Sequence, residues 1–458
     1  MILSELFQRF VEDSPIAVMG RGLMERVLNR QRLDEWFAAT AEKQYTRELL
    51  FSSLFDIMSQ VVCGTHRSVH AAYQASTEDI GVSITSLYNK LNALEPETSA
   101  ALVRYAAGQA APLIEQLGGT LAEPLPGFRV KLLDGNCIEA SEHRIKPLRS
   151  QRAGALPGKS LVVYEPRLGL PIDVFPCEDG HAQERSLLHL VLPTVAANDL
   201  WIADRNFCTR GFLSGLERRE AYFIIRQHGN LPWEAIGPGL RPAGNSPTGA
   251  LSEQRAHVLD EQGEVLSLRR ICVRLKRKTR DGDTHIYLLT NLPGSIASAK
   301  QIAELYRGRW TIETAFQHLA QHLNSEINTL GYPRAALFGF CIALVAYIIL
   351  ATIKAAMRGV WGAETIERGV SGYYIADELS GTYRGMLIAI PEDEWQIFRT
   401  LTQSELVQLL RKLAANINLR RYKKHPRGPK KPSPKGASNK KQPHVSTARL
   451  IANRKRTK

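Results

Sequence analysis

The spacing of apolar and polar residues divides the chain into a helical beginning, a middle of short strands and a helical end. Up to about residue 117 apolar positions recur at helical intervals, and few turn residues interrupt them. From residue 128 onward, short apolar runs bounded by turns predict strands separated by helices. The predicted strands are residues 128–134, 161–164, 172–175, 200–203 and 222–225, and the predicted helices are residues 183–192 and 210–219. This order describes a mixed sheet flanked by helices.

The pattern changes twice more before the C-terminal part. Between residues 229 and 293, strand-like runs alternate with Gly/Asp turns and show no helical period, so we expect a β-rich insertion. Residues 298–324 predict an amphipathic helix, because apolar side chains recur there on one helical face. These side chains are Ile302, Leu305, Ile312, Phe316, Leu319 and Leu323.

Two segments allow more than one interpretation. Residues 335–353 are 19 residues without a charge, which just meets the length of a membrane span. We expect a buried core helix, because it is a single weakly hydrophobic segment, rich in alanine, that follows an amphipathic helix. Residues 67–75 and 83–94 could form a helix-turn-helix, although an ordinary pair of packed helices explains the same apolar stripe.

Composition restricts the class of protein. A chain of 458 residues with 44% hydrophobic and 23% charged residues is typical of a folded protein with several domains. The six cysteines are scattered without a C-x-x-C pair, which argues against a disulfide framework or a zinc finger. We therefore expect a reducing, cytoplasmic compartment, and the first residues do not resemble a secretory signal.

The positive charge is concentrated at the C-terminus. The formal net charge is +14, but residues 411–458 hold 17 Lys or Arg and no Asp or Glu, which leaves −3 for the rest of the chain. This segment is poor in apolar residues, so we predict a disordered basic tail that attracts nucleic acid phosphates. The alternative is a solubilising tail without a specific partner.

Three acidic residues suggest a catalytic site. Asp134 in LLDGN and Asp204 in IADRNF each end a predicted strand, where two carboxylates on neighbouring strands can meet at a cation, although Asp is also a common turn residue. Steps of three and four place Tyr306, Arg309 and Glu313 on one helical stripe. This stripe could be an ion pair on a solvated face, but Trp310 and Phe316 make its surroundings apolar, which favours a carboxylate directed into a site.

Together these motifs resemble the DDE transposases of the IS4 group, which share a ribonuclease H-like catalytic core. The resemblance covers about residues 128–347 and rests on LLDGN, ADRNF and the pattern Y-x-x-R-x-x-x-E in that order. It includes the β-rich insertion between the second Asp and the Glu, the sequence LLTNLP and the alanine-rich helix that follows.

The resemblance implies the chemistry and the roles of the residues. Asp134, Asp204 and Glu313 would bind Mg²⁺ or Mn²⁺, as two ions, and Tyr306 and Arg309 would contact the DNA end. Two such ions activate the attacking oxygen and stabilise the leaving oxygen of a phosphodiester. The implied partners are double-stranded DNA at the transposon ends and the target, without a membrane, and a second copy of the chain in a synaptic homodimer near the nucleoid. One position departs from the family, which has a lysine seven residues after the Glu where this chain has Ala320.

The predicted fold class is therefore α/β, a ribonuclease H-like mixed sheet with a β-rich insertion, a helical N-terminal domain and a disordered basic C-terminal tail. The predicted parts are an N-terminal helical domain with possible DNA binding (1–124), the two parts of the core (125–228 and 294–360), the insertion (229–293), a helical C-terminal region (361–410) and the tail (411–458). The predicted function is cut-and-paste DNA transposition by an insertion sequence transposase. The alternatives are a nuclease of the same fold that does not join strands, and an inactive protein that binds DNA ends, which Ala320 suggests.

Overall fold

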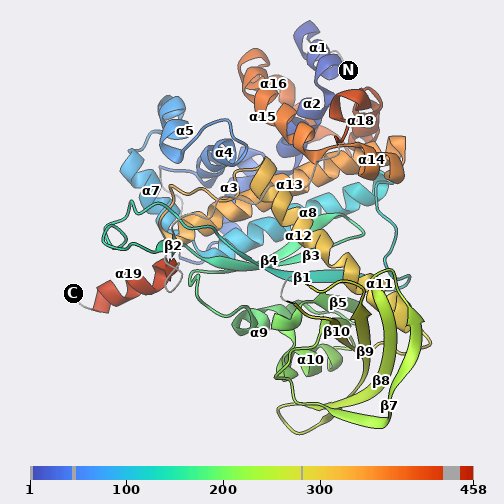
Figure 1. Cartoon of the computed structure of the whole chain (residues 1–458). Coiled ribbons are helices and arrows are strands. Elements are labelled where there is room, and N and C mark those ends of the chain that lie inside the picture. Colours follow the sequence, from blue (N-terminus) through green and yellow to red (C-terminus); the bar gives the residue numbers. More distant parts are fainter. Residues whose placement is uncertain (1–3, 44–47, 280–281, 426–443, 457–458) are drawn as a thin grey trace.

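A nine-stranded sheet forms the centre of the computed structural model, which describes residues 4–43, 48–279, 282–425 and 444–456. The strand order is β4-β3-β1-β5-β6-β10-β9-β8-β7 (Figure 1). The strands are β1 (Arg129–Cys137), β3 (Lys159–Glu165), β4 (Leu170–Cys177), β5 (Asp199–Ala203), β6 (Tyr222–Arg226), β7 (Glu234–Asn245), β8 (Gly249–Leu259), β9 (Val265–Leu275) and β10 (His285–Thr290). A separate two-stranded sheet joins β2 (Gly154–Leu156) to β11 (His444–Ser446).

The first five strands of this order have ribonuclease H-like topology. Strands β1, β3 and β4 form an antiparallel meander, β5 pairs with β1 in parallel, and β6 pairs with β5 in parallel. Each predicted strand of this part coincides with an observed one. The predicted fold class is therefore confirmed in its central sheet.

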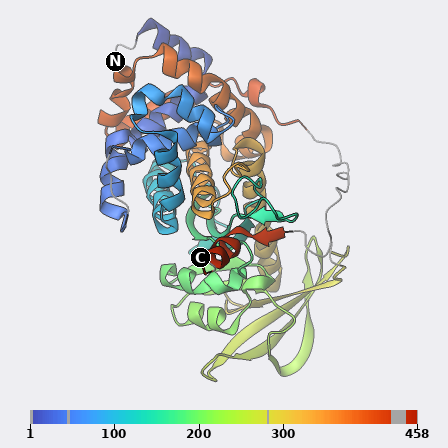
Figure 2. The same ribbon diagram turned by 90° about the vertical axis from the view of Figure 1, so that its left-hand side faces the viewer.

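The β-rich segment extends this sheet instead of forming a separate sheet. Strand β10 pairs antiparallel with β6, and β9, β8 and β7 continue the sheet outward, so these strands project from the lower side of the molecule (Figure 2). Strand β7 was not predicted, because its sequence EAIGPGLRPAGN is rich in Gly and Pro and almost all of it is exposed. Pro is tolerated there because β7 is an edge strand.

Side chains alternate between the two faces of the sheet and enter two separate cores. On one face Val130, Leu132, Leu200 and Ile202 join the large core that the long helices cover. On the other face Leu133, Trp201 and Ala203 join a smaller core. Three short helices and α10 (Arg210–Glu217) lie on that side, where one continuous helix was predicted over residues 183–192. The short helices are η1 (Glu184–Leu187), α9 (Leu188–Val191) and η2 (Leu192–Thr194).

The helix predicted over residues 298–324 is two helices, α11 (Ala299–Gly308) and α12 (Trp310–His322). Helix α11 begins with a capping box, in which the side chains of Ser298 and Gln301 bond to each other's backbone N–H. The helices meet at Arg309, where backbone bonds span three residues, from Arg309 N to Tyr306 O (3.0 Å) and from Ile312 N to Arg309 O (3.1 Å). Such a tighter turn inside a helix often marks a hinge.

Helix α13 (Pro333–Trp361) is the central helix of the large core. Among the described residues it is the one helix that could cross a membrane by length and composition, but 83% of its most apolar window is buried inside the structure. It packs against helices from both ends of the chain, α4 (Phe51–Val62), α8 (Pro96–Gln116) and α18 (Gln403–Ala415). It therefore lies where a core helix is expected.

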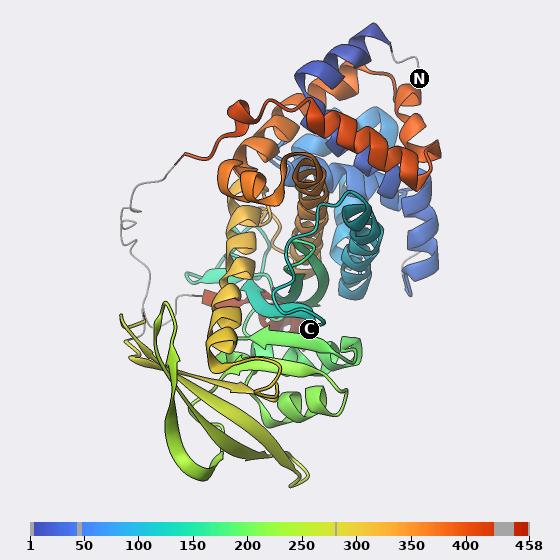
Figure 3. The same ribbon diagram turned by 90° about the vertical axis from the view of Figure 1, so that its right-hand side faces the viewer.

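Helices from the two ends of the chain form one helical layer above the sheet (Figure 3). Phe7 and Trp395 pack together in this layer with ring centroids 4.6 Å apart. The remaining N-terminal helices are α1 (Glu5–Asp13), α2 (Pro15–Val27), α3 (Arg30–Thr40), α5 (Val69–Ala75), α6 (Thr77–Ile80) and α7 (Ile84–Ala93). The remaining C-terminal helices are α14 (Ala363–Gly369), α15 (Gly372–Ala389), α16 (Glu392–Trp395) and α17 (Ile397–Thr400).

The prediction of a disordered tail over residues 411–458 is wrong for the parts of it that the structure describes. Helix α18 continues to Ala415, a 3-10 turn η4 covers Leu419–Tyr422, and β11 and α19 (Thr447–Arg456) follow further along the chain. Strand β11 is held by pairing with β2, and Asp179 accepts hydrogen bonds from Ser446 Oγ (2.5 Å) and Arg449 Nε (2.6 Å). Composition alone does not predict this docking, because the contacts come from the core. Residues 426–443 lie outside the described residues.

Candidate active site

The register of two parallel strands brings Asp134 and Asp204 together. Leu133 on β1 lies opposite Ala203 on β5, so the residue that follows each of them is an aspartate at the same level of the sheet. Alternation places both carboxylates on the face that α11 and α12 cover, because Leu132 and Ile202 point to that side. Two residues that are 70 positions apart in the chain are thus neighbours by strand geometry.

Arg309 links the first of these carboxylates to Glu313. Its Nη1 donates to Asp134 Oδ2 (2.7 Å), and its Nη2 donates to Glu313 Oε1 (2.6 Å). Only 8% of the Arg309 side chain and 17% of the Asp134 side chain are exposed, whereas 46% of the Glu313 side chain is exposed. The pair therefore runs from the interior at Asp134 to the surface at Glu313. The predicted helical stripe accounts for the contact between Arg309 and Glu313. The second partner of Arg309 is Asp134, which is more buried and lies on strand β1.

Tyr306 reaches the second aspartate. It lies one turn before Arg309 on α11, and its hydroxyl donates to Asp204 Oδ1 (3.3 Å). The guanidinium of Arg309 lies 5.9 Å from the centre of the Tyr306 ring. All five residues predicted for the site therefore lie in one cluster between the strand pair β1–β5 and the α11–α12 junction.

The electrostatics of the cluster reflect its burial. Burial raises the pKa of the Asp134 carboxyl to about 6, although Arg309 and the Gly135 N–H oppose this shift. For Arg309, burial lowers the pKa, but the nearby Asp134 carboxylate and other acidic groups outweigh it, so its pKa is raised. Burial also raises the pKa of the Tyr306 hydroxyl, and the Asp204 carboxylate adds to this effect. Arg309 is therefore a permanent cation, and Tyr306 is a neutral donor.

The donor set suits a hard divalent cation, since all three acidic groups offer carboxylate oxygens. In the described part of the chain, however, no group of three or more His, Cys, Asp or Glu residues is already arranged to hold a metal ion. Two of the three carboxylates, Asp134 and Glu313, are instead paired with Arg309. The cluster thus offers the carboxylate oxygens of a metal site, but Arg309 already pairs with two of the three carboxylates.

Glu184 is a neighbour of the site that sequence analysis did not select. A Cβ added to Gly135 would collide with the Glu184 carboxylate, so glycine at this position leaves the space that Glu184 fills. Glu184 Oε2 also accepts a hydrogen bond from Asn206 Nδ2 (3.1 Å). Glu184 thus connects the end of β1 to the turn after Asp204 from the opposite face of the sheet. Gly135 lies in the motif DGN and Asn206 lies in the motif DRN. The contact of Glu184 with both residues is visible only in the folded chain.

The helix surface around Glu313 is less apolar than the sequence predicts. Trp310 was expected to make the helix surface apolar around Glu313, but its side chain is 63% exposed. The burial of the cluster comes from Arg309 and Tyr306 instead. Ala320 is exposed on α12, so a lysine there would have space in this structure.

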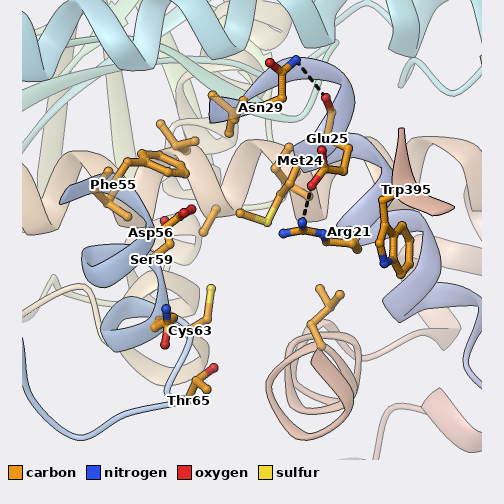
Figure 4. Close-up of a pocket in the computed structure, with 18 of the residues that line it drawn as sticks. Arg21, Met24, Glu25, Asn29, Phe55, Asp56, Ser59, Cys63, Thr65 and Trp395 are labelled. Carbon is orange, nitrogen blue, oxygen red and sulfur yellow. Dashed lines mark hydrogen bonds and ion pairs between the residues drawn. The ribbon is translucent and has the colours of Figure 1, made fainter. Parts of the chain in front are cut away.

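The hollow shown in Figure 4 lies elsewhere, among the helices of the large core. It has a volume of about 220 Å³ and is bounded by α2, α4, α13 and α15. Asp56 and Ser59 on α4 line one side, and Arg21 and Glu25 on α2 line another (Figure 4). It contains none of the predicted site residues, so we treat it as separate from the carboxylate cluster.

Comparison with known proteins identifies relatives of the segment that contains the cluster. Residues 126–349 match the family model described as a transposase DDE domain. The putative transposase y4zB of Sinorhizobium fredii is 26% identical over 42% of this chain and 52% of its own length. The transposase for insertion sequence element IS421 of Escherichia coli is 28% identical over 49% of this chain and 65% of its own length. The matched part thus spans about half to two thirds of these relatives.

A solved structure of piggyBac transposase in a synaptic complex with hairpin DNA covers 86% of both chains, at 13% identity and a TM-score of 0.39. The fold assignment does not depend on this similarity, since it follows from the strand order and directions. The matched segment contains the whole central sheet and every residue of the carboxylate cluster. Residues 126–349 therefore match a DDE-type transposase domain.

Proposed function

We propose that the protein is an insertion sequence transposase that cleaves DNA at the transposon ends and joins them to a target. The observation that carries this proposal is the meeting of Asp134, Asp204 and Glu313 beside the C-terminal halves of the neighbouring strands β1 and β5, around Tyr306 and Arg309. The relatives with insertion sequence names support the same activity. The membership of the IS4 group within the DDE transposases is part of the proposal.

Asp134, Asp204 and Glu313 would hold Mg²⁺ or Mn²⁺, as two ions. Bound ions of this kind activate the attacking oxygen and stabilise the leaving oxygen of a phosphodiester. The chain's own contribution is to fix three carboxylates on rigid elements, two on adjacent strands and one on a helix. Burial keeps water away from Asp134, and the contact of Glu184 with Gly135 and Asn206 supports both strand ends.

Tyr306 and Arg309 would contact the phosphates of the DNA end. The guanidinium fork suits a phosphate as well as a carboxylate, because both present paired oxygens. The basic segment 411–458 would add sequence-independent attraction to DNA. We further propose that two copies of the chain act together on two ends, as a homodimer at the nucleoid.

The test is an assay with DNA that carries the terminal inverted repeats of the element encoding this chain. With Mg²⁺ the protein should nick at the repeat boundary and then give strand-transfer products. Asp134→Ala, Asp204→Ala and Glu313→Ala should each abolish cleavage but keep binding to the DNA end. Glu304→Ala, an exposed acid on α11, is the matched control and should cleave normally.

The alternatives predict other products. Nicking without joining would identify a nuclease of the same fold, and end binding without nicking would identify an inactive protein. Cleavage that persists in Glu313→Ala would reject the site. Ala320→Lys should strengthen end binding if the lysine of the family is missing here, and unchanged affinity would show that another residue supplies that contact.

A further inference from the structure

We propose that Arg309 is an internal counter-ion that occupies the cation position between Asp134 and Glu313, and that a divalent metal ion must displace it. The displaced guanidinium then becomes available to a DNA phosphate. This inference rests on the proposed function, since it concerns the same carboxylates. It adds that metal binding and DNA binding are coupled, because Arg309 pairs with the site carboxylates without metal and is free for a DNA phosphate once metal is bound.

The first support is that the carboxylates are already satisfied without a metal ion. Asp134 Oδ2 accepts from Arg309 Nη1 (2.7 Å), and Asp134 Oδ1 accepts from the Gly135 N–H (3.0 Å). Glu313 Oε1 accepts from Arg309 Nη2 (2.6 Å). Hydrogen bonds between charged groups are short and strong, so a metal ion that binds these carboxylates has to replace strong hydrogen bonds.

The second support is competition for the same oxygens. Mg²⁺ lies about 2.0–2.1 Å from its oxygen ligands, closer than the guanidinium nitrogens lie here. A metal ion bridging Asp134 and Glu313 would enter the space that Arg309 fills and would bring two positive charges against it. Because Arg309 is almost fully buried, water screens that repulsion only weakly. Bridging by a metal ion and bridging by Arg309 are therefore alternatives.

The third support is that Arg309 is placed to change partners. It stands at the junction of α11 and α12, where bonds from Arg309 N to Tyr306 O and from Ile312 N to Arg309 O replace regular helical bonds. The preceding Gly308 has open space beside its Cα. Arg309 Nε is buried and has no hydrogen-bond partner among the described residues, so the present contacts leave one donor of the guanidinium unused.

A titration with Mn²⁺ in the absence of DNA tests the inference on the full chain, with free Mn²⁺ measured by electron paramagnetic resonance. The variant is Arg309→Gln, and the matched control is Arg307→Gln, an exposed arginine two residues earlier on α11. Arg309→Gln should bind Mn²⁺ at least about tenfold more tightly than the wild type, because the two charged hydrogen bonds from Arg309 to Asp134 and Glu313 no longer have to be broken. Arg307→Gln should bind like the wild type.

Thermal unfolding provides a second readout that does not depend on cleavage. In EDTA, Arg309→Gln should unfold at a lower temperature, because Asp134 and Glu313 lose their counter-ion. Mn²⁺ should raise its unfolding temperature by more than it raises that of the wild type or of Arg307→Gln. A variant that fails to fold would be recognised by the absence of this Mn²⁺-dependent recovery, which would count against the inference.

Two failures can be told apart with the double variant Asp134→Asn/Arg309→Gln. If Mn²⁺ binding does not depend on Asp134 in either background, the proposed metal site is wrong and the inference falls with it. If binding depends on Asp134 but Arg309→Gln binds Mn²⁺ equally or more weakly than the wild type, the site stands. In that case the counter-ion role alone is overturned.

Discussion

Lys131 Nζ lies 2.6 Å from Asp199 Oδ2 in the interior and joins β1, which contains Asp134, to β5, which Asp204 directly follows. Their side chains are 6% and 2% exposed, and the Lys131 ammonium lies 5.0 Å from the centre of the Trp201 ring. Asp199 opens β5, and Lys131 lies opposite Trp201 in the same strand pair. This ion pair therefore supports the register that places Asp134 beside Asp204.

Removing one member of this pair should destabilise the protein strongly. Lys131→Met leaves the Asp199 carboxylate buried without its cation, and such changes cost about 3–5 kcal/mol. Urea unfolding of the wild type, Lys131→Met and Lys131→Met/Asp199→Leu measures the effect. The double variant should regain most of the loss, because no buried charge remains. A single variant as stable as the wild type would show that the pair contributes little to this register.

The contact between Gly135 and Glu184 should appear as energetic coupling. Gly135→Ala puts a methyl group where the Glu184 carboxylate lies, so the flexible Glu184 side chain has to turn away and lose its hydrogen bond to Asn206, which should cost about 0.5–1.5 kcal/mol. Glu184→Ala removes the obstacle, so the double variant should be more stable than the sum of the single changes predicts. A double-mutant cycle by urea unfolding should give a coupling of about 0.5–3 kcal/mol. Strict additivity would show that Glu184 does not support this strand end.

The central sheet could be predicted because strand signals are local. Short apolar runs lead into Asp134 and Asp204, and such runs bounded by turn residues predict strands from the sequence alone. The spacing of Tyr306, Arg309 and Glu313 likewise follows from helix geometry alone. Strand signals and helical spacing thus select the five residues of the cluster from the sequence alone.

What could not be predicted depends on contacts between distant segments. The bond between Arg309 and Asp134 joins residues 175 positions apart, and it decides which cation the carboxylates already hold. Glu184 lies near the site because the opposite face of β1 has a glycine there. The segment 444–456 was predicted from its composition to be disordered. In the structure it is held by strand β2 and Asp179, which lie far away in the sequence and do not enter a composition count.

The Asp56 carboxyl should make stability depend on pH. The Asp56 side chain is 36% exposed, and it lines the hollow of Figure 4. Burial raises the pKa of its carboxyl to about 6, although the nearby Arg30 and Arg21 oppose this shift. Since the pKa of an unfolded aspartate is about 3.9, the folded state binds the proton more tightly. Ionisation therefore destabilises the fold as pH rises from about 4 to 6, and the penalty remains at higher pH.

Asp56→Asn removes this penalty. The variant should be more stable than the wild type at pH 8, and the difference should shrink through pH 6 and vanish near pH 4, when thermal unfolding is measured across this range. The Arg30 ion pair is absent from the variant, but Arg30 is largely exposed, so this cost is small. Asp377→Asn, on the exposed side of α15, is the control for the removal of an acidic group. A variant that is less stable than the wild type at pH 8 would contradict the sign.

Asp179 should control the docking of the C-terminal segment. Its two oxygens hold Ser446 and Arg449, so Asp179→Ala should release β11 and α19 and make the backbone after Arg449 and Arg454 accessible to trypsin. Mass spectrometry of a limited digest should show faster cleavage after these two arginines. Glu178→Ala is the matched control, because the neighbouring Glu178 pairs with Arg334 instead. Equal cleavage in both variants would show that Asp179 does not hold the segment.

The basic segment as a whole should add affinity for DNA without adding sequence preference. A deletion after Leu419 removes 15 of the 17 Lys and Arg that residues 411–458 contain, since only Arg411 and Lys412 remain. Because phosphate contacts carry no sequence information, binding to the terminal repeat and to random DNA should weaken by similar factors. The slope of log affinity against log salt should also fall by about 0.9 for each DNA phosphate that the truncated protein no longer neutralises. Salt titrations of the full and truncated proteins with both DNAs measure this. If only the preference for the terminal repeat disappears, the docked strand β11 and helix α19 read the DNA sequence, and the tail is a recognition element.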